Sequence, residues 1–183
     1  MPRIEALDRN TAPQASSELL DAVLKKIGMI PNLYATVAHS PESLSGLLGF
    51  SESLGKGQLS PQLREQIALT VAGYNGCDYC ASAHTAIGKM VGLAEDELTQ
   101  NLTAKSSDTK SQAALTLATS ILETKGHVSN DLIQTTREAG YSNREIIEIF
   151  ANTIVNIFTN YFNHLADVEI DFPVVKSQAN ATV

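Results

Sequence analysis

The 183-residue chain contains no tryptophan, only two cysteines, and 13 basic residues against 20 acidic ones. Its lysines and arginines are nowhere clustered, and the formal net charge is −7. Nucleic acids and anionic membranes are bound through concentrated positive charge, which this sequence does not offer. We therefore expect neither nucleic acid nor a membrane surface among its main partners.

Long apolar runs are also missing. The first five residues include no hydrophobic segment typical of a secretory signal. The most apolar stretch, residues 146–162, is interrupted by asparagines and is too short and polar to span a bilayer. These features favour a cytoplasmic protein. In that reducing compartment, two cysteines three residues apart are not expected to form a permanent structural disulfide.

Helical patterns, by contrast, cover almost the whole chain. Residues 16–27 carry apolar side chains at helical spacing, and Gly28 follows as a stop signal. The pairs Ser40-Pro41 and Ser60-Pro61 each combine an N-cap residue with a first-turn proline, so helices are expected to begin there. The expected helices span residues 16–27, 40–55, 60–75, 78–92, 94–102, 109–124, 129–139 and 142–166.

Strand patterns are absent apart from the short pair Val174-Val175. The hydrophobic content of 43% is that of an ordinary globular protein, and the length suits one domain with a real core. We therefore predict a single all-α domain over residues 1–175, with antiparallel helices joined by short loops. Residues 176–183 are expected to form a flexible C-terminal tail.

Residues able to carry chemistry are concentrated around the two cysteines. Cys77, Cys80 and His84 are spaced three and four residues apart, which places them on one face of a helix. If that helix begins near Asp78, Cys80 lies in its first turn, where unpaired N–H groups and the helix dipole favour a thiolate. His84, one turn further on, can accept a thiol proton directly or through a water. The spacing indicates a thiol redox centre.

Glu65 is the fourth candidate in this region. It precedes the apolar segment 67–73, whose helix is expected to be buried, and a carboxylate beside it needs a partner or a proton. The tight Asn75-Gly76 turn folds this helix against the next, so that Glu65 can approach and orient His84. The simpler alternative is an acidic residue that the helix dipole favours in the first turns.

A zinc site and a haem attachment site both fit the cysteine pair less well than a redox centre. Zinc normally takes four ligands, and only His84 is near the pair, whereas His39, His127 and His164 are scattered along the chain. Covalent haem attachment needs a histidine directly after the second cysteine, where this chain has Ala81. We therefore expect no bound metal and no bound cofactor.

The last expected helix carries a row of asparagines on one face, at Asn152, Asn156, Asn160 and Asn163. Such a face is most often solvated, although it can also line an active-site wall or a subunit contact. At the start of the same helix, the segment from Ser142 to Glu145 has the form of a capping box.

The order Glu65, Cys77, Cys80 and His84 resembles the AhpD-like alkylhydroperoxidases of the carboxymuconolactone decarboxylase superfamily. The likeness is specific over about residues 60–93 of this chain. It implies a compact, all-helical AhpD-like fold that assembles as a homo-oligomer, often a trimer or a hexamer.

The same resemblance implies roles for the individual residues. Cys80 corresponds to the peroxidatic thiol and Cys77 to the resolving thiol, with His84 and Glu65 as a proton relay. The implied activity is reduction of alkyl hydroperoxides or hydrogen peroxide, with an intramolecular disulfide that an external lipoyl- or thioredoxin-like dithiol reduces.

One residue departs from the family pattern. Tyr79 stands between the cysteines, where the best-known members have a histidine. Tyrosine can donate a hydrogen bond but is a poor base at neutral pH, so it is a possible accessory residue only. Two further activities stay open from the sequence: a thiol–disulfide relay, and a redox-sensing oligomer without significant peroxidase turnover.

Overall fold

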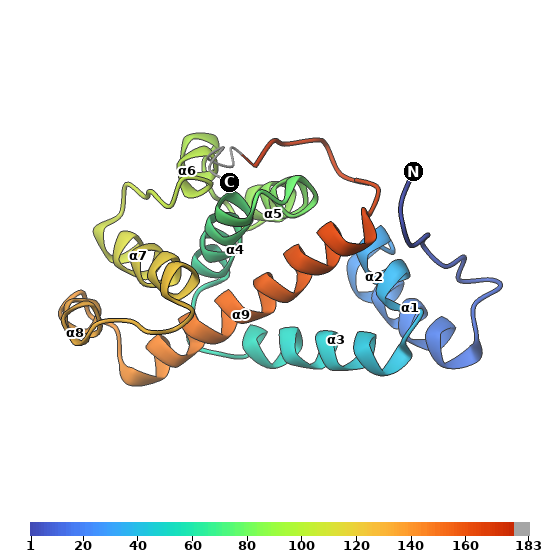
Figure 1. The fold of residues 1–183 in the computed structure, drawn as a ribbon, viewed down its shortest axis with the longest axis horizontal. Coiled ribbons are helices and arrows are strands. Elements are labelled where there is room, and N and C mark those ends of the chain that lie inside the picture. Colours follow the sequence, from blue (N-terminus) through green and yellow to red (C-terminus); the bar gives the residue numbers. More distant parts are fainter. Residues whose placement is uncertain (178–183) are drawn as a thin grey trace.

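The computed structural model describes residues 1–177, and within that range it contains nine helices and no strand (Figure 1). The predicted all-α fold is therefore confirmed. The helices are α1 (Gln14–Ile27), α2 (Asn32–Val37), α3 (Pro41–Gly55), α4 (Pro61–Asn75), α5 (Asp78–Met90), α6 (Glu95–Asn101), α7 (Thr109–Thr124), α8 (Asn130–Glu138) and α9 (Asn143–Ala166). None of them combines the length and apolarity needed to cross a membrane.

Local sequence signals set most of the helix ends. The hydroxyls of Ser40 and Ser60 accept hydrogen bonds from the backbone N–H groups of Ser43 and Leu63, as N-cap residues do. Gly28 ends α1 with a φ of 85°, a conformation that favours glycine. Helix α2 was missed by the sequence prediction because its six residues are too few to show a helical repeat.

Helix α4 lies at the centre of the molecule and packs against α5, α7 and α9 (Figure 1). Residues 66–73 of α4 are all buried, as its apolar sequence predicted. At Gly73 the backbone of α4 comes so close to the α6–α7 connection that an added Cβ would overlap the carbonyl oxygen of Leu102. The missing side chain is therefore what allows this connection to reach the central helix.

Two apolar clusters surround α4. One includes Leu69 and Ala72 and gathers residues of α1, α2, α3 and α5, including both cysteines. The other includes Ile67 and Val71 and packs against α7 and the start of α9. The cysteine pair is therefore part of the hydrophobic core and does not lie at the surface.

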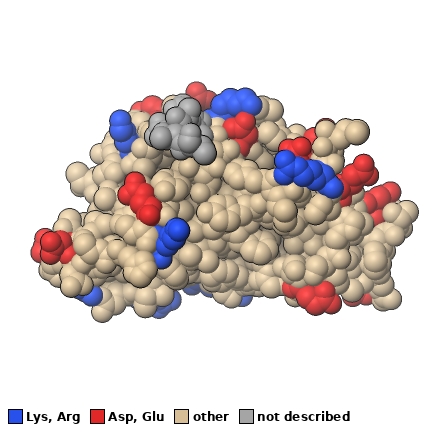
Figure 2. All heavy atoms as spheres, viewed as in Figure 1, with Lys and Arg blue, Asp and Glu red and all other residues tan. Residues whose placement is uncertain are grey.

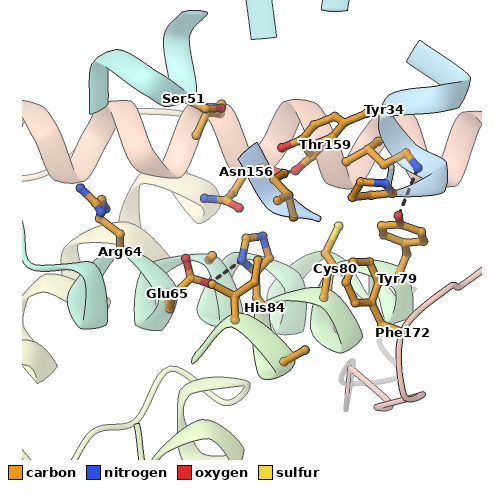
Figure 3. A pocket seen from close by; sticks show the side chains of 18 of the residues that line it. Tyr34, Ser51, Arg64, Glu65, Tyr79, Cys80, His84, Asn156, Thr159 and Phe172 are labelled. Atoms are coloured by element: carbon orange, nitrogen blue, oxygen red, sulfur yellow. Dashed lines mark hydrogen bonds and ion pairs between the residues drawn. The ribbon is translucent and has the colours of Figure 1, made fainter. Parts of the chain in front are cut away.

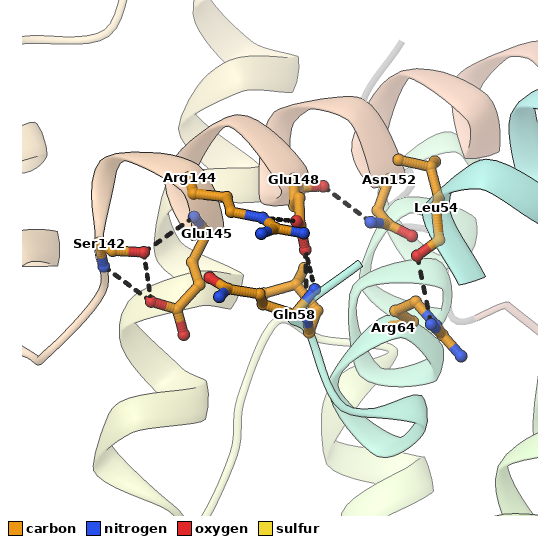
Figure 4. Close-up of polar contacts among 9 residues, drawn as sticks. Leu54, Gln58, Arg64, Ser142, Arg144, Glu145, Glu148 and Asn152 are labelled. Atoms are coloured by element: carbon orange, nitrogen blue, oxygen red, sulfur yellow. Dashed lines mark hydrogen bonds and ion pairs between the residues drawn. The ribbon is translucent and has the colours of Figure 1, made fainter. Parts of the chain in front are cut away.

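Polar contacts fix the start of α9 to the α3–α4 loop (Figure 4). Ser142 and Glu145 form the predicted capping box. The Glu148 carboxylate accepts hydrogen bonds from the backbone N–H groups of Gln58 and Leu59 and forms an ion pair with Arg144. These contacts set the rotation of α9 about its own axis.

That rotation leaves an apolar stripe of α9 on the outside of the molecule. The stripe consists of the exposed residues Ile147, Phe150, Ile154, Phe158, Tyr161 and Leu165. Charged side chains are sparse over the centre of the face shown in Figure 2, in the same view in which α9 crosses the molecule in Figure 1.

The chain after α9 returns along α5. The backbone N–H of Val175 donates to the Ser82 hydroxyl at 2.9 Å, and Lys176 and Ser177 both bind the Asp78 carboxylate. Lys176 and Ser177 are thus held against the start of α5, although a flexible tail was expected from residue 176. Residues 178–183, the rest of that expected tail, lie outside the described residues, and Val174-Val175 forms no strand.

Candidate active site

The α4–α5 turn determines where the cysteines lie. Gly76 ends α4 with a φ of 71°, which turns the chain sharply into α5. Cys77 is the N-cap residue of α5, and its Sγ accepts a hydrogen bond from the backbone N–H of Cys80 at 3.2 Å. A cysteine thus fills the position that serine, threonine or aspartate normally takes at a helix start.

The two sulfurs lie side by side beneath the surface. Cys77 and Cys80 are free thiols, 1% and 2% exposed, and their Sγ atoms are 2.6 Å apart. The two thiols are therefore placed to form a disulfide with each other when they are oxidised. In the described part of the chain, no three His, Cys, Asp or Glu side chains converge in a way that would hold a metal ion.

The environment shifts the two thiol pKa values in opposite directions. The hydrogen bond between the thiols lowers the pKa of Cys77 despite burial, and the backbone N–H of Cys80 adds to this effect. Burial raises the pKa of Cys80, as does the neighbouring Cys77 sulfur. The N-cap hydrogen bond of α5 thus goes to Cys77, the residue before the helix, and not to Cys80 in its first turn.

Glu65 and His84 form an ion pair one turn of α5 beyond the cysteines. The Nδ1 of His84 is 2.7 Å from Oε2 of Glu65. The His84 side chain is 22% exposed and the Glu65 side chain is 16% exposed. Burial alone would lower the pKa of His84, but the charge and hydrogen bond of Glu65 outweigh burial and raise it. The expected approach of Glu65 to His84 is thus present, and it orients the imidazole through Nδ1.

A cavity of about 410 Å³ joins these groups (Figure 3). Cys80, His84 and Glu65 lie along one side of it, and Asn156 and Thr159 of α9 lie opposite. Cys77 is not among the lining residues, so only Cys80 of the pair is open to a molecule in the cavity. The remaining lining residues are Ile27, Met29, Pro31, Leu33, Tyr34, Ser51, Leu54, Gly55, Arg64, Ala68, Tyr79, Ala83, Ala86, Ile87, Met90, Asn152, Val155 and Phe172.

The asparagine row of α9 faces inward, which decides a question that the sequence left open. Asn152, Asn156, Asn160 and Asn163 are all buried, with exposed fractions of 7% or less. The first two line the cavity, and Asn163 donates from Nδ2 to Cys80 Sγ at 3.1 Å. Asn152 and Asn156 therefore form part of a wall of the candidate site, whereas Asn160 does not line the cavity.

Residues 41–124 match the model of the carboxymuconolactone decarboxylase family. This segment runs from α3 through α7 and includes Glu65, both cysteines and His84. Over these residues the chain is similar to the carboxymuconolactone decarboxylase family.

Solved structures share the fold of this protein over nearly its whole length. One is the alkylhydroperoxidase AhpD core of an uncharacterised peroxidase-related protein from Ralstonia eutropha JMP134, 22% identical, with a TM-score of 0.84, covering 93% of this chain and 92% of that one. A peroxidase-related protein from Silicibacter sp. TM1040 is 24% identical, with a TM-score of 0.79 and coverages of 90% and 91%.

A third similar structure is a cysteine-to-alanine variant of the debrominase Bmp8 in complex with 2,3,4-tribromopyrrole. It is 21% identical, with a TM-score of 0.78, and the match covers 92% of this chain and 91% of that one. Among the curated proteins no match was found.

Tyr79, the departure from the AhpD-like pattern between the cysteines, is engaged elsewhere. Its hydroxyl accepts a hydrogen bond from the backbone N–H of Leu33 at 3.1 Å, and its ring packs edge-on against Phe172. Burial raises the pKa of its hydroxyl. Tyr79 thus ties α2 and the C-terminal segment to α5, and no hydrogen bond joins its hydroxyl to either sulfur within the described structure.

Several cavity residues of this protein were not identified as site residues from the sequence. Tyr34 reaches the cavity from α2, and burial, with a contribution from the Glu65 charge, raises its pKa. Arg64 lies next to Glu65 on α4 and donates from Nη1 to the carbonyl oxygens of Leu54 and Gly55. Neither residue was assigned a chemical role from the sequence, because neither lies at helical spacing from the cysteines.

Proposed function

We propose that this protein reduces alkyl hydroperoxides or hydrogen peroxide with its two thiols. The observation that carries the proposal is the cavity in which Cys80 and the His84–Glu65 pair lie on the same side. A hydroperoxide in that cavity meets a sulfur nucleophile and a proton donor together. This combination of groups is what cleavage of an O–O bond by a thiol requires.

In the first step, the Cys80 thiolate attacks the terminal oxygen of R–O–O–H. An S–O bond forms, the O–O bond breaks, and the products are a Cys80 sulfenic acid and an alkoxide. The His84 imidazolium gives its proton to the alkoxide, which leaves as an alcohol, or as water when the substrate is hydrogen peroxide. Glu65 holds the imidazole in place and favours its protonated form.

In the second step, the Cys77 thiolate attacks the sulfenic sulfur of Cys80. The S–S bond forms and the hydroxyl group leaves, taking up one proton to become water. The 2.6 Å separation of the two sulfurs means that little movement is needed. An external dithiol then returns both cysteines to thiols by disulfide exchange and is itself oxidised to a disulfide.

The burial of the pair bears on the choice of reductant. Both sulfurs are at most 2% exposed, and the cavity gives access to Cys80 alone. A dithiol on a slender arm, such as a lipoyl group, fits this access better than a thioredoxin-like active site on a broad protein surface. We therefore favour a lipoyl-type dithiol as the reductant.

The apolar stripe of α9 supports the further proposal that the protein is a homo-oligomer. Its six exposed residues recur every three or four positions, as residues do at helix–helix contacts. Replacing Phe158 in the middle of the stripe with glutamate should dissociate such an assembly, as measured by sedimentation. Unchanged sedimentation of a folded Phe158→Glu protein would contradict the use of this stripe.

The fold shared with Bmp8 gives a second candidate activity, reductive debromination. In such a reaction here, the two thiols would supply two electrons, a proton would replace bromine on the substrate, and the products would be the protein disulfide and bromide. The largely apolar lining of the cavity favours such a substrate as much as an alkyl hydroperoxide. A thiol–disulfide relay is less well supported, because a partner protein would have to reach buried sulfurs.

Turnover assays separate these activities. With dihydrolipoamide as reductant, we expect consumption of cumene hydroperoxide, no release of bromide from 2,3,4-tribromopyrrole, and complete loss of turnover in Cys80→Ser. Cys77→Ser should retain only a single reduction of peroxide per chain. Peroxide turnover that survives in Cys80→Ser would overturn the assignment, and bromide release without peroxide consumption would favour the debrominase.

A further inference from the structure

Asn163 of α9 forms a hydrogen bond with the dithiol. Its Nδ2 lies 3.1 Å from Cys80 Sγ and 3.9 Å from Cys77 Sγ. The side chain is 5% exposed, and its Oδ1 is buried without a hydrogen-bond partner in the described structure. The amide is therefore placed so that its donor is used and its acceptor is not.

An unpartnered buried acceptor destabilises a fold, because the oxygen loses its water without gaining a donor. A leucine of similar size at this position would avoid that loss. The amide at position 163 is thus poorly explained by packing alone. Its N–H group, which points at the dithiol, is the feature that an apolar residue could not supply.

The position of the negative charge in the cysteine pair depends on which sulfur receives hydrogen bonds. The N-cap hydrogen bond and the thiol–thiol contact favour the negative charge on Cys77, which does not line the cavity. Attack on a substrate in the cavity requires the charge on Cys80. The single proton of the pair must therefore pass from the Cys80 sulfur to the Cys77 sulfur, across 2.6 Å, before the reaction.

We propose that the Asn163 side-chain amide directs the thiolate charge of the dithiol to Cys80. Its N–H group is 0.8 Å closer to Cys80 than to Cys77 (3.9 − 3.1), so it stabilises a charge on Cys80 more than one on Cys77. Asn163 is thereby a catalytic residue that touches the reacting sulfur. Its role in turnover rests on the proposed peroxidase function, but the placement of the charge can be measured without any peroxide.

Asn160, one turn earlier on α9, provides a matched control. It is equally buried, and its Oδ1 accepts a hydrogen bond from Asn75 at 3.1 Å. Its Nδ2, however, has no hydrogen-bond partner within the described residues, and so it donates no hydrogen bond to a sulfur. Asn160→Leu makes the same chemical change in the same helix without removing a donor from the dithiol.

The test measures the rate at which iodoacetamide alkylates Cys80 as a function of pH, in a Cys77→Ser background and with both thiols present. Peptide mass spectrometry identifies the alkylated sulfur. In Asn163→Leu we expect the Cys80 pKa to rise by about one unit, with alkylation roughly tenfold slower at pH values below that pKa. Asn160→Leu should leave both quantities unchanged, although its melting temperature falls with the loss of the Asn75 contact.

The other titratable groups around Cys80 are the same in the wild type, Asn163→Leu and Asn160→Leu. They are Tyr79 and His84 on α5, Glu65 on α4 and Tyr34 on α2, so the comparison isolates the amide. If Asn163→Leu fails to fold, Asn163→Ala removes the same donor with less bulk. An unchanged Cys80 alkylation profile would overturn the proposal. Faster alkylation would overturn it too, because it would mean that the amide accepts from the Cys80 thiol and keeps it protonated.

Discussion

Two carboxylates beside different faces of α4 are held in very different ways. Glu65 lines the cavity and, among residues 1–177, has one hydrogen-bond partner, the ionisable imidazole of His84. Glu97 on α6 is 9% exposed and accepts five hydrogen bonds from neutral donors. These donors are Gln66 Nε2, Asn101 Nδ2, Ser106 Oγ, and the backbone N–H and Oγ of Ser107.

The difference separates a carboxylate that supports chemistry from one that supports the fold. Burial alone would raise the pKa of Glu97, but its hydrogen bonds lower the pKa to about 2, so the group stays ionised and structural. Glu65 acts instead on its partner, since it raises the pKa of His84 beside an open cavity. Two adjacent residues of α4 thus have different roles. Glu65 contacts His84 in the candidate site, and Gln66 contacts Glu97 in the structural hydrogen-bond network.

Removing the charge of Glu97 should have the largest effect on stability. Its pKa is about 2 in the folded protein and 4.5 unperturbed, so Glu97→Gln is expected to cost about 3 kcal/mol of unfolding free energy near pH 7. Urea unfolding measures this change. Peroxide turnover per folded molecule should stay close to that of the wild type. Loss of turnover without loss of stability would contradict the assignment of Glu97 to the fold.

Glu65→Gln should show the opposite behaviour. Loss of the relay is expected to lower kcat/KM for peroxide roughly 100-fold, a typical contribution of general acid–base catalysis, with little change in unfolding free energy. Without Glu65 the His84 pKa falls, so the imidazolium is lost at a lower pH and the alkaline limb of the pH–rate profile should move toward acid. An alkaline limb that stays in place would remove Glu65 from the relay.

Acid should remove the stability that Glu97 provides. The Glu97 pKa is depressed in the folded state, so its contribution is complete above about pH 4.5 and is lost as the pH falls toward 2. Within that window, the stability difference between wild type and Glu97→Gln should shrink by about 1.4 kcal/mol per pH unit. A difference that does not depend on pH would show that Glu97 acts by packing alone.

Of these substitutions, Gln66→Met is expected to change the free energy of unfolding the least. It removes one of the five donors to Glu97 while it leaves the neighbouring Glu65 untouched, and it should cost about 1 kcal/mol of unfolding free energy. Turnover should be unaffected. Turnover that falls as much as in Glu65→Gln would show that the two sides of α4 are not independent.

The sequence predicted the helices and the Glu65, Cys77, Cys80 and His84 constellation because both depend on local spacing. It did not predict Glu97, whose helix Glu95–Asn101 has an acidic first turn and resembles a solvated segment. The partners of Glu97 come from α4 and from residues 106 and 107, which only the tertiary structure brings together.

Helix α9 shows a second limit of sequence reasoning. Its periodicity separates an asparagine face from an apolar face, but periodicity alone does not say which face lies inside. The usual rule places the asparagines in solvent, whereas here the contacts of Glu148 with Gln58 and Leu59 turn them toward the cavity. The hydrogen bond that Cys77 Sγ accepts from the Cys80 N–H was likewise missed, because it depends on which residue is the N-cap of α5.

The most direct test of the central claim is to find which sulfur reacts first with a peroxide. Reduced Cys77→Ser and Cys80→Ser proteins are each mixed with one equivalent of cumene hydroperoxide and dimedone, and the labelled cysteine is mapped by mass spectrometry. We expect one sulfenic acid label on Cys80 and one cumyl alcohol per chain in Cys77→Ser, and neither in Cys80→Ser. A label that forms on Cys77 at a comparable rate, or no label in either protein, would contradict the account.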